Sequence, residues 1–112
     1  MIVRIVKMTF KPETVNQFLA VFESSKEKIR AFEGCEHLKL LQEKKEGNIF
    51  LTYSYWQSEI HLNNYRHSEL FKDTWAKTKV LFADKPEAWS VNKLHELLKQ
   101  NRIQNVWRLL EL

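Results

Sequence analysis

Residues 35–56 read CEHLKLLQEKKEGNIFLTYSYW, and this stretch decides the fold. Leucines in its first part and aromatic and β-branched residues in its last part predict two strands, Cys35 to Lys45 and Ile49 to Trp56. The residues between them, 46–48, form a turn in which Gly47 supplies a positive φ. The stretch therefore predicts a β-hairpin.

The segment before the hairpin predicts a strand followed by a helix. Residues 2–10 are mostly apolar on both faces, which is typical of a strand in the interior of a sheet. Pro12 stands where the first helical turn should begin, and Gly34 is expected to end the helix. Between them, the apolar residues at helical spacing are Val15, Phe18, Leu19, Phe22, Ile29 and Phe32.

The segment after the hairpin predicts two helices and a last strand. Ser58 is expected to cap a short helix, and Ser68 a second helix that presents Phe71, Trp75, Thr78 and Phe82 on one side. Residues 84–86 contain a proline that stops this helix. The last strand is expected to hold Trp89, Val91, Lys93 and Leu94. The resulting order, β-α-β-β-α-β, predicts an α+β, ferredoxin-like fold with a four-stranded antiparallel sheet.

The domain and its tail both need a partner surface. Residues 1–95 are interpreted as the ferredoxin-like domain and residues 96–112 as an amphipathic helical extension, with Ile103, Val106, Trp107 and Leu110 on one face. A helix this short is marginal in water alone. Helices on one side of the sheet would leave its other, largely apolar face bare. We therefore expect a homodimer with the two sheets face to face.

Composition excludes several classes of protein. The 112 residues leave room for one domain, and 44% hydrophobic with 29% charged residues excludes a disordered chain. The net charge of +4 is interspersed, so no nucleic-acid partner is expected. The single cysteine, Cys35, excludes an internal disulfide and is interpreted as structural. No apolar stretch approaches the ~20 residues of a membrane span, and no signal peptide is visible. We expect a cytoplasmic protein without a membrane partner.

Three short runs carry a family resemblance. They are Phe32-Glu33-Gly34-Cys35, Tyr55-Trp56-Gln57-Ser58-Glu59 and Ser68-Glu69-Leu70-Phe71. Their order and spacing resemble the antibiotic biosynthesis monooxygenase (ABM) domain family over about residues 1–95. The resemblance implies a homodimer whose sheets join into a dimeric α/β barrel. It also implies oxygen-dependent chemistry on a phenolic or quinol-like substrate, without a metal or flavin cofactor.

One branch of that family degrades haem, and the chain departs from its pattern. That branch uses an Asn on the first strand, a Trp on the short helix and a His on the following helix. The matching positions here are Lys7, Tyr65 and Trp75. All three differ from the pattern, so haem degradation is disfavoured.

Oxygenation without a cofactor requires a base that removes a proton from the substrate. Among the four histidines, His67 is the best candidate, because it lies at the junction of the two predicted helices. We expect His67 to be the catalytic base. The alternative interpretation is an exposed residue at a helix end. No two histidines have the i, i+4 spacing of a metal site, so no metal is expected.

Aromatic residues predict the binding site. We expect a pocket between the sheet and the helices of residues 58–82, with Tyr53, Tyr65, Phe71 and Trp75 binding the substrate. These residues would otherwise belong to the core. The predicted function is cofactor-independent monooxygenation of a small aromatic, quinol- or anthrone-like substrate by molecular oxygen. Two alternatives remain open: a non-catalytic module that binds a small aromatic molecule, and a structural dimer.

Overall fold

The computed structural model describes residues 1–98. Its elements in chain order are β1 (Ile2–Thr9), the short 3₁₀ helix η1 (Pro12–Thr14), α1 (Val15–Arg30), β2 (Cys35–Gln42), β3 (Ile49–Trp56), α2 (Glu59–Arg66), α3 (Glu69–Lys79) and β4 (Glu87–Asn92). This order confirms the α+β, ferredoxin-like fold. The predicted amphipathic helix in the tail falls on residues 99–112, outside the described part.

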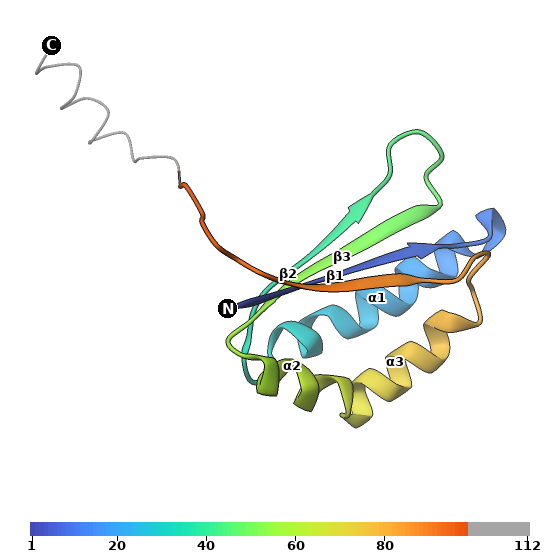
Figure 1. The fold of residues 1–112 in the computed structure, drawn as a ribbon. Coiled ribbons are helices and arrows are strands. Elements are labelled where there is room, and N and C mark those ends of the chain that lie inside the picture. Colours follow the sequence, from blue (N-terminus) through green and yellow to red (C-terminus); the bar gives the residue numbers. More distant parts are fainter. Residues whose placement is uncertain (99–112) are drawn as a thin grey trace, which may run out of the picture.

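The four strands form one antiparallel sheet in the order β2-β3-β1-β4. The predicted interior position of β1 is confirmed, since β1 pairs with β3 on one side and β4 on the other. All the helices of residues 1–98 lie against the same face of the sheet (Figure 1). Among residues 1–98, no helix is long and apolar enough to cross a membrane.

Several predicted boundaries are wrong by a few residues. The first helix ends at Arg30 rather than at Gly34, and Gly34 instead takes a φ of 89° just before β2. β2 ends at Gln42, and β4 ends at Asn92. α3 ends at Lys79, before Phe82, because Phe82 pairs with Phe10 in an isolated β-bridge instead. Tertiary packing has overridden the local helical pattern at these ends.

Both predicted serine caps are confirmed. The Ser58 hydroxyl accepts a hydrogen bond from the backbone N–H of His61 at 3.2 Å. The Ser68 hydroxyl accepts one from the N–H of Phe71 at 3.1 Å. Each bond satisfies an otherwise unpaired donor at the start of a helix, so two helices form back to back rather than one long helix.

The core consists of two clusters on the helix side of the sheet. The larger contains Met8, Phe10, Phe18, Phe50 and Leu81, and the smaller contains Cys35, Trp56 and Leu62. Phe10 is fully buried and stacks on Phe18, with ring centroids 4.2 Å apart. Trp56 is also fully buried. The two clusters together fix how the helices sit on the sheet.

The opposite face of the sheet carries no helix within the described residues (Figure 1). Because side chains alternate along a strand, this face holds Tyr53 and Tyr55 of β3 and Trp89 and Val91 of β4. Trp89 is 45% exposed and Val91 41%. The sheet therefore presents a partly apolar outer face to its surroundings.

Candidate functional site

A cavity of about 360 Å³ lies between the sheet and the helices. This volume is at the lower end of the range for small-molecule sites, ~300–1,000 Å³. Members of both core clusters line it, among them Met8 and Phe18 of the larger and Trp56 of the smaller. The cavity therefore reaches the core from the surface, because exposed residues such as Arg66 and Ala88 also line it.

The sheet wall of the cavity follows from strand alternation. Arg4, Val6 and Met8 of β1 face inward, as do alternate residues of β3, because side chains two apart share a face. The β3 residues of this wall are Thr52, Ser54 and Trp56. Pro86 and Ala88 line the cavity beside β1, at the edge of the sheet.

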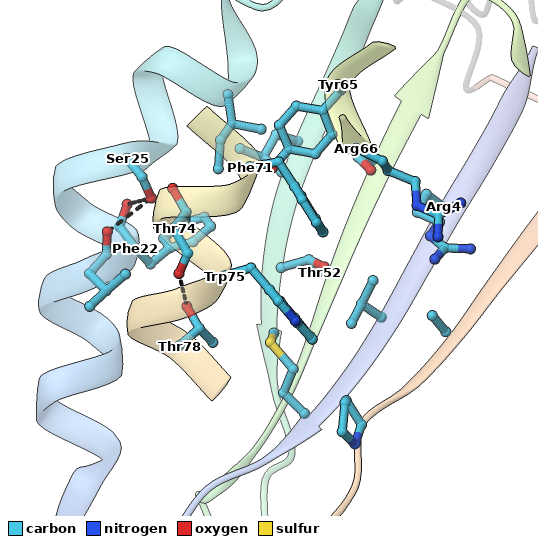
Figure 2. Close-up of a pocket in the computed structure, with 18 of the residues that line it drawn as sticks. Arg4, Phe22, Ser25, Thr52, Tyr65, Arg66, Phe71, Thr74, Trp75 and Thr78 are labelled. Atoms are coloured by element: carbon cyan, nitrogen blue, oxygen red, sulfur yellow. Dashed lines mark hydrogen bonds between the residues drawn. The ribbon is translucent and has the colours of Figure 1, made fainter. Parts of the chain in front are cut away.

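A continuous row of aromatic rings forms the wall on the side of α2 and α3. Tyr65 stacks on the buried Trp56, with centroids 4.9 Å apart and planes 24° apart. Phe71 meets the Tyr65 ring edge-on at 5.3 Å and stacks on Trp75 at 5.9 Å and 9°. Figure 2 shows Phe71 and Trp75 extending from α3 toward the strands. Such a wall suits a flat aromatic ligand.

Three hydroxyl groups in the described walls already take part in hydrogen bonds within the protein. Ser25 donates to the carbonyl of Val21 at 2.9 Å, and Thr78 donates to that of Thr74 at 2.8 Å (Figure 2). Ser54 accepts from the indole Nε1–H of Trp56 at 3.0 Å. These bonds hold the wall residues to their own backbone or to each other, so the lining behaves as mostly apolar.

Two arginines supply the positive charge of the site. Arg4 extends from β1 and Arg66 is the last residue of α2, and both line the cavity. Nη1 of Arg4 donates to the Ser90 hydroxyl at 2.9 Å. Partial burial, and then repulsion from Arg66, lower the pKa of the Arg4 guanidinium below its usual value. The two cations are therefore close enough to interact.

Tyr65 is the remaining titratable side chain in the lining that the structure describes. Burial is the main cause that raises the pKa of its phenol well above the usual value of 10.0, and the nearby Cys35 adds to it. The phenol therefore stays protonated at neutral pH and can act as a hydrogen-bond donor. Within residues 1–98 the lining contains no His, Asp, Glu, Cys or Lys. The same part of the chain has no cluster of side chains suited to a metal ion.

The structure brings together three of the five predicted site residues. Tyr65, Phe71 and Trp75 line the cavity, as expected, and it lies where the pocket was predicted, between the sheet and the helices after β3. The expected lining is wrong at His67 and Tyr53, which do not border it.

His67 is exposed at the end of α2, where it serves as the C-cap residue. Its Nδ1 lies 2.7 Å from the carbonyl oxygen of Asn63, one turn earlier in the helix. This local contact holds the imidazole against its own helix. This position agrees with the alternative interpretation, in which His67 is an exposed residue at a helix end.

Tyr53 and Lys7 lie on the outer face of the sheet. Tyr53 is one residue out of phase with Thr52 and Ser54, which line the cavity, and packs on Tyr55 instead, with centroids 5.6 Å apart. Lys7 is likewise out of phase with Val6 and Met8. The residues of β1 that face the cavity near this position are therefore apolar.

Arg4 and Arg66 are the site residues that sequence reasoning missed. For Arg4 a signal was present, because alternation places it on the same face as Val6 and Met8, whose burial requires the helix side. An arginine on that face needs a reason. Arg66 gave no such signal, because a basic residue in the last turn of a helix is ordinary.

Comparison with known proteins identifies the family. Residues 1–77 match the sequence model described as antibiotic biosynthesis monooxygenase, ABM. No curated protein matches the chain. Solved structures match closely in fold, including a crystal structure described as an antibiotic biosynthesis monooxygenase (TM-score 0.80, 18% identity, 85% of this chain and 100% of the other).

Two further structures agree. A conserved protein from Methanosarcina mazei Go1 matches with a TM-score of 0.78 and 26% identity, over 83% of this chain and 93% of the other. A Mycobacterium tuberculosis protein matches with a TM-score of 0.78 and 19% identity, over 85% and 96%. The family match covers more than half of the sequence, and it includes β1, β3, α1, α2 and most of α3, while β4 lies beyond the matched residues. This chain belongs to the antibiotic biosynthesis monooxygenase family.

Proposed function

We propose that this protein binds a small aromatic molecule in the cavity and oxygenates it with molecular oxygen. The observation that carries the proposal is the row of rings from Trp56 through Tyr65 and Phe71 to Trp75, which lines a cavity of about 360 Å³. A flat ring system can stack on such a row and fill the space. Membership of the monooxygenase family supports the choice of reaction.

The lining favours a substrate that ionises easily, because the described lining offers no side-chain base. A quinol- or anthrone-like molecule meets this requirement, since its anion is delocalised over the ring system. The proton leaves to water at the mouth of the cavity. The protonated Tyr65 phenol can donate a hydrogen bond to the oxyanion, and the apolar walls keep bulk water from the reacting carbon.

The reaction balances without an added reductant for an anthrone-like substrate. The anion gives an electron to O2, and the two radicals combine into a hydroperoxide at the ring methylene carbon. Loss of water from the hydroperoxide leaves a carbonyl. The carbon thus loses two hydrogens and gains one oxygen atom, and the second oxygen atom departs as water.

A second copy of this chain is proposed as the partner. The outer face of the sheet exposes Trp89 and Val91, and three leucines after β4 are also exposed: Leu94 at 82%, Leu97 at 97% and Leu98 at 78%. Apolar surface of this kind commonly marks an interface. Two sheets joined by these outer faces would leave each cavity on its own helix side.

A non-catalytic binding module is the second candidate, and a specific observation favours it. His67, the expected base, is exposed at a helix end, and no other histidine borders the cavity within residues 1–98. In this reading the chain binds the same class of aromatic molecule and releases it unchanged.

Oxygen uptake with a panel of quinols and anthrones tests the proposal. We expect uptake with at least one compound, and incorporation of one ¹⁸O atom per product molecule from ¹⁸O2. Ala88→Phe adds a ring to the cavity wall and should lower the rate about tenfold or more, because a ligand pocket tolerates little added volume. Ala76→Phe, on the exposed side of α3, is the matched control and should keep the wild-type rate.

The same panel separates the candidates. Tight binding without oxygen uptake would replace the oxygenase with the binding module. Neither binding nor uptake would leave only the structural dimer.

A further inference from the structure

Two cations meet at one end of the cavity. Arg4 reaches the lining from the middle of the sheet and Arg66 from the end of α2. Figure 2 draws both guanidinium side chains on the same side of the cavity, away from Ser25 and Thr78. Arg4 is half-buried and Arg66 is exposed, so this end is the mouth.

No protein carboxylate balances these charges in the described part of the chain. The four ion pairs among residues 1–98 all involve lysines, and the lining contains neither Asp nor Glu. Ser90 engages one nitrogen of Arg4 and leaves other N–H donors available. Burial, and then repulsion from the nearby Arg66, lower the pKa of Arg4, so an anion placed between the two guanidiniums would offset both effects.

We propose that Arg4 and Arg66 clamp the carboxylate of an aromatic acid at the mouth of the cavity, while its rings lie along Tyr65, Phe71 and Trp75. A guanidinium presents its N–H donors in a fork that matches the two oxygens of a carboxylate. The ring wall provides the apolar half of the site and the arginine pair the anionic half. This inference rests on the proposed function, because it specifies the ligand of the same cavity.

The clamp would also orient the ligand. The carboxylate at the mouth directs the far end of the ring system toward Met8 and Phe18, where the larger core cluster closes the cavity. A ligand without the carboxylate keeps the stacking but loses this fixed direction. Charge at the mouth therefore selects among aromatic molecules of similar shape.

Binding of 2-naphthoate and 2-naphthamide tests the clamp, because the two probes share their rings and differ in charge. Calorimetric titration of the full chain should show naphthoate binding about ten- to a hundredfold more tightly than naphthamide, the range expected for charged hydrogen bonds. Arg66→Gln should lower the affinity for naphthoate by a similar factor and change the affinity for naphthamide by no more than about twofold. Arg66→Lys should restore part of the loss, since a lysine keeps the charge but not the fork.

Lys79→Gln is the matched control. It removes one positive charge from an exposed site on α3 that does not line the cavity, and it should leave both affinities unchanged. Raising the salt concentration should lower the affinity for naphthoate more than the affinity for naphthamide, because added ions screen the charge at the open mouth.

The outcomes separate this inference from the proposed function. Equal affinities for the two probes, or an Arg66→Gln variant that binds both like the wild type, would overturn the clamp and leave aromatic binding intact. A loss in Lys79→Gln as large as that in Arg66→Gln would overturn it as well, since net charge alone would then explain the effect. Failure of both probes to bind at millimolar concentration would overturn the clamp and the proposed function together.

Discussion

Gly34 lies directly against the imidazole of His61, so a Cβ atom added at residue 34 would overlap the ring. The imidazole has little room to move, because its Nδ1 lies 2.7 Å from the Ser58 hydroxyl that caps α2. The backbone at Gly34 also has a φ of 89°, which side chains rarely tolerate. The start of β2 and the start of α2 are thus held together at a single contact.

Gly34→Ala should therefore destabilise the protein by about 2–4 kcal/mol, combining backbone strain with the overlap. Urea unfolding measures the change. Gly47→Ala is the matched control: Gly47 also has a positive φ, of 76°, but its nearest neighbour would be 3.5 Å away, so only about 1 kcal/mol is expected. Equal losses in the two variants would show that the His61 contact contributes nothing.

The phenol of Tyr65 predicts a loss of stability in alkaline solution. Burial raises its pKa above the usual 10.0, so the unfolded state releases the proton first as the pH rises. Stability is therefore fully present below pH 10 and falls above it, by at most about 1.4 kcal/mol per pH unit. Urea unfolding between pH 8 and 11 should show that the free energy of unfolding falls less steeply with pH in Tyr65→Phe than in the wild type. A loss of stability in Tyr65→Phe as steep as in the wild type would mean that the buried phenol does not cause the decline.

The buried indole of Trp56 depends on one serine. Its Nε1–H donates to Ser54 at 3.0 Å, and both residues are buried. Ser54→Ala leaves this donor without a partner and should cost about 1–3 kcal/mol of unfolding free energy. Ser24→Ala removes an exposed hydroxyl from α1 and should change stability by less than about 0.5 kcal/mol. A Ser54→Ala protein as stable as the wild type would mean that the indole finds water in the cavity.

The outer face of the sheet predicts the oligomeric state. Light scattering at micromolar concentration should give twice the chain mass of 13.5 kDa. Val91→Asp places a charge on that face and should shift the equilibrium toward the monomer, whereas Ala76→Glu on the exposed side of α3 should not. A wild-type mass of 13.5 kDa under these conditions would contradict the proposed dimer.

The fold was predictable because its signals are local and mutually consistent. The hairpin around Gly47 and the serine caps at Ser58 and Ser68 depend on residues within a few positions of each other. The ends of elements were less predictable. Phe82 continues the helical pattern of α3, but it contacts Phe10, which is far away in sequence, and that contact ends the helix early.

The candidate site was predictable only in part. Tyr65, Phe71 and Trp75 share helical faces with apolar neighbours, so their orientation toward the sheet follows from periodicity. His67 was chosen for its chemistry and its place at a helix junction, yet the direction of its side chain depends on the final turn of α2. The prediction for Tyr53 is wrong for a simpler reason: neighbouring residues on a strand point to opposite faces of the sheet, so an error of one residue places the side chain on the wrong face.

The bonded hydroxyls of the cavity wall have a consequence for how this site could change over time. Ser25 and Thr78 already donate their hydrogens to their own helices, so these two hydroxyls have no hydrogen left to offer a ligand. Discrimination would then fall to the rim, at Arg4, Arg66 and Ala88, while Phe10 and Trp56 maintain the fold from within. Substitutions at the rim could retarget the protein to new molecules without weakening it, which makes the scaffold readily evolvable.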